Sequence, residues 1–253
     1  MAKKNSRVVV RGNGSGGFDR RMIYVLAALV VLIVLIILSR KFSTDSKVTT
    51  TEHAVAPEVL AGIPREGKGG DPELNLQKNR VTIPSKFEEY TPEGITALKH
   101  SLLDGDGRKH RSNWDADAQK YLASMESIGA RLTGYLIAVK QSGPESCNGY
   151  VDSLRDYHIW VGDSPQATKS QSVIVEMTPR WKEVHPEWRL RYLEKLVESH
   201  ARVRASGWLF WDEEHANEVD KSRGTQWEVH PVTQFEVSSN GAWQTLDGKT
   251  ALP

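Results

Sequence analysis

Residues 172–211, SVIVEMTPRWKEVHPEWRLRYLEKLVESHARVRASGWLFW, hold the pattern that decides the fold. The run Ser172–Met177 is rich in β-branched residues, which is typical of a strand. Leucines then recur at helical spacing between Pro186 and His200, which predicts a helix. Residues 202–211 return to an extended pattern. The stretch therefore predicts a strand, a helix and a second strand.

Three further strands are predicted around this unit. Residues 132–139 are rich in β-formers, residues 157–161 alternate apolar and polar side chains, and Trp227–Val237 reads as a final strand. The resulting order, β-β-β-α-β-β, is that of the OB-fold, a small Greek-key barrel. We therefore predict an all-β core with one helix, an OB-fold-like five-stranded barrel, over residues 130–238. An SH3-like barrel and a mixed α+β sheet are the alternatives.

The N-terminal part predicts a single transmembrane helix. Residues 1–21 carry six basic side chains and one acidic side chain, and an apolar run follows over 22–39. Its uncharged residues span roughly 26 Å as a helix, enough for the hydrocarbon core of a bilayer. The positive-inside rule places the basic tail in the cytoplasm and the C-terminal domain outside it. Because no signal-peptidase site follows, we expect an uncleaved signal anchor in the bacterial inner membrane, with the barrel in the periplasm.

The segments that flank the barrel are predicted to be simpler. Residues 40–84 lack an apolar period and are rich in Ser, Thr, Pro and Gly, which predicts a flexible tether. Residues 85–129 read as a helical lead-in, because Thr91 followed by proline is a helix start and a second helix is predicted over 114–127. Residues 239–253 are expected to form a C-terminal tail.

Composition and charge limit the function classes. Hydrophobic residues make up 39% and charged residues 26%, which excludes a disordered chain and a multi-spanning membrane protein. A single cysteine excludes an internal disulfide framework. From Ala130 onward there are 14 basic and 17 acidic side chains, whereas nucleic-acid binding needs a basic surface. No nucleic-acid partner is therefore expected.

Short motifs in the barrel stretch resemble those of a known group of proteins. They are Asp156-x-His158, Glu176-Met-Thr-Pro-Arg180 and Arg223-Gly-Thr-x-Trp-Glu-Val-His-Pro231. Together they resemble uncharacterised bacterial proteins, often exported or membrane-anchored, that have an OB-like core. The resemblance covers about 131–237 and implies the fold and a bacterial origin, but it implies no activity.

Imidazole and carboxylate side chains recur along the predicted strands and the loop before the last one. Zn²⁺ and Mn²⁺ are bound by such nitrogen and oxygen ligands. The metal-ligand candidates are His158, Glu176, His215 and His230, and the catalytic candidates are His158, Glu176, Glu228 and His230. A metal-activated water would then attack a phosphoester or another ester, with a carboxylate as general base. A structural hydrogen-bond network is the alternative interpretation, and it is the one we favour from the sequence.

Aromatic and basic side chains supply the candidates for ligand binding, which are Trp160, Arg180, Trp208, His215 and Arg223. Trp160 and Trp208 fall out of register with the apolar alternation and are expected to be exposed, where aromatic rings can stack on a ligand. Trp211 and Trp227 follow that alternation and are expected in the core.

Two functions remain open. The leading expectation is a membrane-anchored, non-enzymatic binding or protein-interaction module of the bacterial cell envelope, without a cofactor. Its partners would be the bilayer, through residues 22–39, and an envelope protein or a glycan. The alternative is a membrane-tethered metal-dependent hydrolase that uses Zn²⁺ or Mn²⁺. Convergence of His158, Glu176 and His230 near one point would favour the hydrolase.

Overall fold

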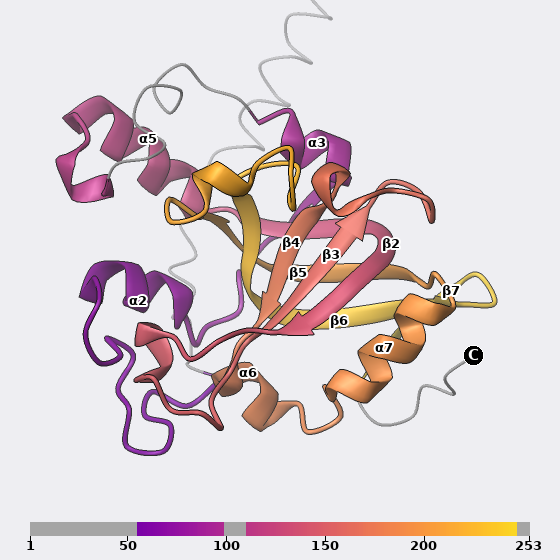
Figure 1. Ribbon diagram of the computed structural model, residues 1–253, viewed down its shortest axis with the longest axis horizontal. Coiled ribbons are helices and arrows are strands. Elements are labelled where there is room, and N and C mark those ends of the chain that lie inside the picture. Colours follow the sequence, from indigo (N-terminus) through magenta and orange to yellow (C-terminus); the bar gives the residue numbers. More distant parts are fainter. Residues whose placement is uncertain (1–54, 99–109, 247–253) are drawn as a thin grey trace, which may run out of the picture. The chain divides into compact units, whose positions relative to one another are not determined.

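The computed structural model describes residues 55–98 and 110–246, and in them one sheet winds into a barrel (Figure 1). Its strands are β1 (Glu88–Tyr90), β2 (Gly129–Gln141), β3 (Tyr157–Gly162), β4 (Val173–Met177), β5 (Arg202–Trp211), β6 (Trp227–Ser239) and β7 (Ala242–Thr245). The strand order is β1-β2-β3-β4-β6-β5, and β2 also pairs with β5. This additional pairing closes β2, β3, β4, β6 and β5 into a five-stranded barrel.

The closed barrel confirms the OB-like prediction in strand order. The predicted helix is α7 (Leu190–Glu198), which lies between β4 and β5, and a short α6 (Pro179–Val184) precedes it. Two strands were not predicted. β1 pairs with β2 in parallel, and β7 pairs with β6 inside the expected C-terminal tail.

Barrel closure depends on long, bent strands and on one glycine. β2 pairs with β3 through its second half and with β5 through its first half. The register between β5 and β6 shifts on both sides of Gly207. A Cβ atom at Gly207 would lie 2.1 Å from the carbonyl oxygen of Pro231, so only glycine lets the strands approach there.

The core is made by the inward-facing residues of the barrel strands. Leu132, Ile159, Val175, Leu209 and Val229 are all completely buried. α7 packs on β2 and buries its leucine face, as its helical period predicted (Figure 1).

The flexible tether expected over 40–84 is wrong for the described part of that segment, residues 55–84. This part contains α2 (Pro72–Lys78), and it lies against the barrel. The indole of Trp181 donates to the carbonyl oxygen of Arg80 at 2.8 Å, and that of Trp208 to the oxygen of Thr82 at 3.0 Å. These contacts are made to backbone carbonyl groups, so they do not require apolar side chains at regular spacing. The sequence of this segment therefore shows no apolar period.

The lead-in over 85–129 holds β1, α3 (Pro92–Thr96), the 3₁₀ turn η1 (Arg111–Asn113) and α5 (Ala116–Glu126). Thr91 caps α3 as predicted, accepting from the backbone N–H of Gly94. α5 begins later than predicted because Asp115, accepting from the N–H of Ala118, is its cap.

The predicted membrane helix belongs to a part of the chain that precedes the barrel. Backbone contacts divide the chain into residues 1–50 and 51–253. The predicted tail, 1–21, and the predicted membrane helix, 22–39, lie outside the described residues. Among the helices that the structure describes, none has the length and apolar character needed to cross a bilayer.

Candidate functional site

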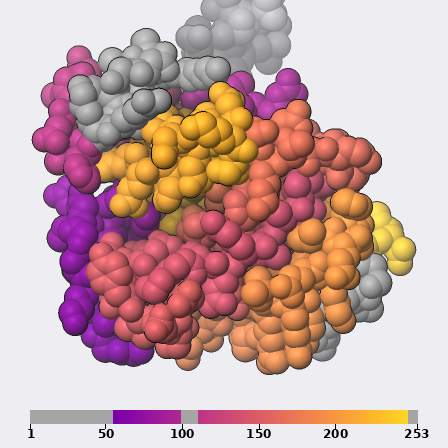
Figure 2. Space-filling view, viewed as in Figure 1, coloured from indigo at the N-terminus to yellow at the C-terminus, as the bar shows by residue number. Residues whose placement is uncertain are grey.

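Most of the predicted polar candidates gather in one pocket of about 320 Å³. Its lining residues are Lys78, Lys140, Ser142, Gly143, Glu145, His158, Glu176, Asp212, Glu214, His215 and Glu228. They come from α2, the end of β2 and the loop after it, the strands β3, β4 and β6, and the loop between β5 and β6. Figure 2 shows these segments meeting around a hollow on one face of the molecule.

Strand pairing places the central carboxylate between two imidazoles. β3 and β4 pair so that His158 lies opposite Glu176, and β6 runs along the other side of β4. His158 Nε2 is 3.2 Å from Glu176 Oε1, and His230 Nδ1 is 3.2 Å from Glu176 Oε2. His230 Nδ1 is also 3.5 Å from Glu228 Oε2. The predicted catalytic residues therefore converge on Glu176.

A chain of buried ion pairs extends from this centre to the surface. Arg223 Nη2 lies 2.7 Å from Glu228 Oε1, and Arg223 Nη1 donates to Asp212 at 2.5 Å. Asp212 Oδ2 is 2.7 Å from Nδ1 of the half-exposed His215. Burial of Asp212 opposes its ionisation, but the hydrogen bond with His215 and the charge of Arg223 outweigh burial and hold its pKa far below the usual range.

The carboxylates on either side of His158 have different acidities. Burial, together with the nearby charge of Glu228, raises the pKa of Glu176 well above its ordinary value. For Glu145, burial is outweighed by the hydrogen bond with His158 and the charge of Lys78, which lower its pKa to about 2. Glu145 Oε1 is 3.7 Å from His158 Nε2. Two carboxylates whose pKa values are pushed apart are typical of acid–base sites.

Asp156, Glu176 and His230 form one group of neighbouring side chains that could hold a metal ion. One ligand atom from each lies within 4.8 Å of the others, and all three residues are buried. Asp156 Oδ2 and His230 Nε2 have no hydrogen-bond partner, whereas His230 Nδ1 faces Glu176 and Glu228. Since unpartnered buried polar atoms are costly, a divalent cation among them would supply what they lack.

Sequence reasoning missed Asp156 as a ligand. The available signal was its place two residues before His158, on the same face of the chain. His158 contacts the other oxygen of Glu176, and His215 pairs with Asp212. These two predicted metal ligands therefore lie beside the buried trio.

The pocket also contains charged residues that were not predicted. Lys78 comes from the segment expected to be a tether, and its Nζ lies 2.8 Å from Glu214 Oε2 and 3.9 Å from Glu145 Oε2. Asp212 and Glu214 lie in the loop that follows β5. No sequence spacing links Lys78 to the strands, so only the fold brings it to the pocket.

The prediction that Trp160 and Trp208 are exposed is wrong, because both are buried. The indole of Trp160 donates to the carbonyl oxygen of Ser222 at 2.6 Å, and Lys169 Nζ lies 4.1 Å from its ring centroid. Trp160 is covered by the loop between β5 and β6, and Trp208 by the segment around Thr82. These segments bury strand faces that the alternation of apolar residues had suggested were exposed. Trp211 and Trp227 are in the core, as predicted.

Arg180 does not line the pocket either. It is buried, and its guanidinium donates four hydrogen bonds of 2.8–2.9 Å to the carbonyl oxygens of Pro57, Glu58, Ile63 and Pro64. Of the predicted ligand-binding residues, His215 lines the pocket and Arg223 supports it. Arg180 instead attaches the N-terminal segment to α6.

Comparison with known proteins gives one structural likeness. No family model matches the chain, and no curated protein matches it. Among solved structures, the chain is similar to one described as "Crystal structure of yeast Stn1 and Ten1", with 13% sequence identity and a TM-score of 0.32. The match covers 62% of this chain and 65% of that chain, which is less than two thirds of its length. A TM-score this low assigns no function.

The expectation that no nucleic acid binds is nevertheless corrected, because the net charge on which it rested is a poor guide to the surface. Five acidic side chains from Ala130 onward are buried, against two basic ones, so exposed charges balance among the described residues. The buried acids are Asp156, Glu176, Asp212, Glu213 and Glu228. Nucleic acid is therefore no longer excluded, and no partner is assigned from this likeness.

Proposed function

We propose that this protein is a membrane-tethered, metal-dependent hydrolase of phosphoesters or other esters, with its active site in the pocket around Glu176. The observation that carries the proposal is the placement of one imidazole against each oxygen of a single buried carboxylate, at 3.2 Å on both sides. Two ligands of a tetrahedral Zn²⁺, each at 2.0–2.1 Å, are about 3.3 Å apart. The separation between His230 and Glu176 therefore suits two atoms that share a cation, while His158 contacts the other oxygen of the same carboxylate.

The cation would be held by the buried residues Asp156, Glu176 and His230, of which Glu176 lines the pocket. A bound divalent cation polarises the substrate and lowers the pKa of water. His158 lies nearer the solvent, between Glu176 and Glu145, in the position of a proton carrier. The two carboxylates orient its ring in the way that catalytic imidazoles require.

Hydrolysis in this arrangement uses one water molecule. The water oxygen bonds to phosphorus, or to the carbonyl carbon of another ester, while the bond to the leaving oxygen breaks. His158 takes the proton that the water loses and passes it to the leaving oxygen. The pocket lining holds Lys78 and Lys140 beside five carboxylates, so the cation would have to supply most of the positive charge that an anionic substrate needs.

The location belongs to the same proposal. A single-pass anchor over 22–39, with a cytoplasmic basic tail and the barrel in the periplasm, is supported by the apolar run and the charges before it.

The test is hydrolysis by the purified full-length chain in detergent. Substrates are p-nitrophenyl phosphate, bis(p-nitrophenyl) phosphate and p-nitrophenyl acetate, each with EDTA and then with Mn²⁺ or Zn²⁺. We expect cation-dependent hydrolysis that falls at least 100-fold in His158→Ala, as loss of general acid–base catalysis does. His200→Ala is the matched control, because His200 is an exposed histidine that does not line the pocket. Absence of hydrolysis with any cation would contradict the proposal.

One observation favours the second candidate, a non-enzymatic binding module of the cell envelope. Arg223 and Lys78 already neutralise part of the carboxylate cluster, as they would in a structural network. This candidate predicts no turnover of any substrate and a fold that is stable in EDTA. An envelope protein or a glycan would then be its partner.

A further inference from the structure

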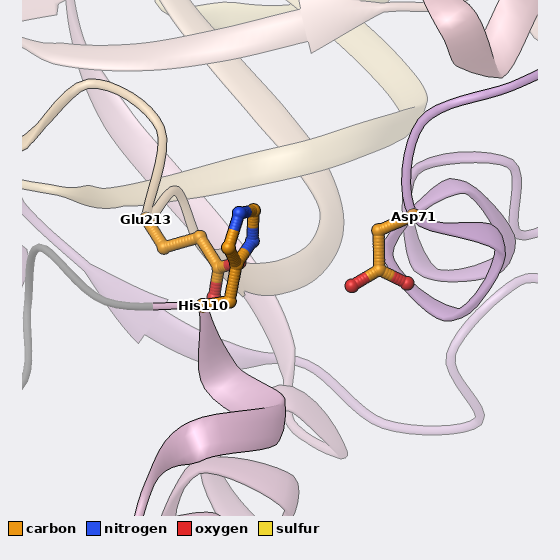
Figure 3. A group of neighbouring side chains, drawn as sticks. All are labelled: Asp71, His110 and Glu213. Atoms are coloured by element: carbon orange, nitrogen blue, oxygen red, sulfur yellow. The ribbon is translucent and has the colours of Figure 1, made fainter.

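A second group of ligand-type side chains lies outside the pocket around Glu176. It consists of Asp71 at the start of α2, His110 before η1 and Glu213 after β5 (Figure 3). One ligand atom from each lies within 4.8 Å of the other two. None of the three lines the first pocket. The group therefore joins three parts of the chain that are distant in sequence.

Glu213 is the buried residue of the three, and only one of its two carboxylate oxygens accepts a hydrogen bond. Its side chain is 3% exposed. Oε2 accepts from Arg111 twice, from the backbone N–H at 2.9 Å and from Nε at 3.2 Å. Oε1 is buried without a hydrogen-bond partner and lies 3.4 Å from His110 Nδ1. Arg111 thus fixes the carboxylate and leaves one oxygen available beside the imidazole.

Asp71 completes the group from the other side. Its Oδ1 caps α2, accepting from the N–H groups of Glu73 at 2.9 Å and Leu74 at 3.3 Å. Figure 3 shows its carboxylate on the side of α2 that faces His110 and Glu213. The cap fixes the position of Asp71 and does not use Oδ2.

We propose that Asp71, His110 and Glu213 bind a divalent transition-metal ion of the Zn²⁺ type. Two ligands of a tetrahedral Zn²⁺ lie about 3.3 Å apart, and the His110–Glu213 separation is 3.4 Å. One imidazole and two carboxylates form a ligand set that zinc uses, and a water fills the fourth position on the exposed side of His110. The ion gives Glu213 Oε1 the partner that it lacks. This site stands independently of the hydrolase proposal.

The ion would tie α2 and the segment before α5 to the loop between β5 and β6. α2 ends with Lys78, which reaches Glu214, the residue after Glu213. The second site therefore holds in place the helix that brings Lys78 to the pocket.

The test measures metal binding by the full-length chain and needs no substrate. The chain is treated with EDTA, the EDTA is removed, and Zn²⁺ is titrated by calorimetry, with Co²⁺ absorption as a second readout. Glu176→Gln, made first, weakens the site around Glu176, so that the remaining stoichiometry reports the second site. We expect about one Zn²⁺ per chain in this background and at least tenfold weaker binding after His110→Ala.

Two further variants separate ligation from folding. Asp71→Ser keeps a good helix cap and removes the carboxylate, so it should also weaken Zn²⁺ binding at least tenfold. His200→Ala should leave it unchanged. If His110→Ala and Asp71→Ser both bind Zn²⁺ as tightly as the parent chain, the proposal is overturned and His110 and Glu213 form only an ion pair.

Discussion

Arg180 attaches residues 57–64 to the barrel through a single buried side chain. Its four hydrogen bonds all go to backbone carbonyl oxygens, which have no substitute once the guanidinium is removed. We expect Arg180→Ala to lower the free energy of unfolding by about 3 kcal/mol. Arg180→Lys should recover little of this free energy, because an ammonium group cannot reproduce the planar donor geometry of the guanidinium.

Urea unfolding and limited trypsin digestion check this expectation together. Loss of the guanidinium should speed cleavage near Arg65, in the segment that Arg180 holds. Arg189→Ala is the control, since Arg189 is exposed and its side chain donates to the nearby oxygen of Pro186. A variant as stable and protease-resistant as the parent chain would contradict this role of Arg180.

Lys182 gives the stability a dependence on pH. Burial lowers its pKa to about 8, although the charge of Asp156 acts in the opposite direction. The unfolded chain binds the proton with a normal lysine pKa near 10.4, so between these values the unfolded state holds more protons. The contribution of Lys182 to the free energy of unfolding therefore rises with pH from about 8 to about 10.

Lys182→Met removes the ionisable group and keeps much of the apolar stem. We expect the variant to lose this alkaline rise while remaining folded. Urea unfolding of both proteins at pH 7, 8, 9 and 10 provides the measurement. Parallel pH profiles for the two proteins would mean that Lys182 titrates normally.

At the scale of the elements, β5 and β6 are joined by a charged cross-strand pair. Arg204 and Glu236 lie opposite each other and form two hydrogen bonds of 2.6 Å, with both side chains mostly buried. A double-mutant cycle with Arg204→Ala and Glu236→Ala should give a coupling of about 1 kcal/mol. A coupling near zero would show that the pair adds no more than its separate side chains do.

The elements also show what the sequence can predict. β5 runs from Arg202 to Trp211 as predicted, and α7 lies within the expected helix, because each buries one face and so carries a period. The same alternation assigned His158, Glu176, Glu228 and His230 to faces of their strands, but it left open whether these faces converge. Residues 55–84 carry no such period because they hold the barrel through carbonyl oxygens. Lys78 could not be predicted to enter the site for the same reason.

At the scale of the whole molecule, residues 55–98 are integral to the barrel. Three buried tryptophans donate their indole N–H groups to carbonyl oxygens before residue 99: Trp181 to Arg80, Trp208 to Thr82 and Trp227 to Leu98. Arg180 adds four contacts of the same kind. The predicted domain over 130–238 therefore omits partners that its own core requires.

A fragment of residues 130–238 should thus fail to fold cooperatively, whereas residues 55–246 should fold. Each buried indole left without a partner costs about 1–3 kcal/mol. The cost of losing three such hydrogen bonds, added to the cost of losing those of Arg180, approaches the free energy of unfolding of a whole domain, which is about 5–15 kcal/mol. Near-UV circular dichroism and urea unfolding distinguish the two fragments. If residues 130–238 unfold as sharply as the longer fragment, residues 55–98 only cover the barrel and do not complete its core.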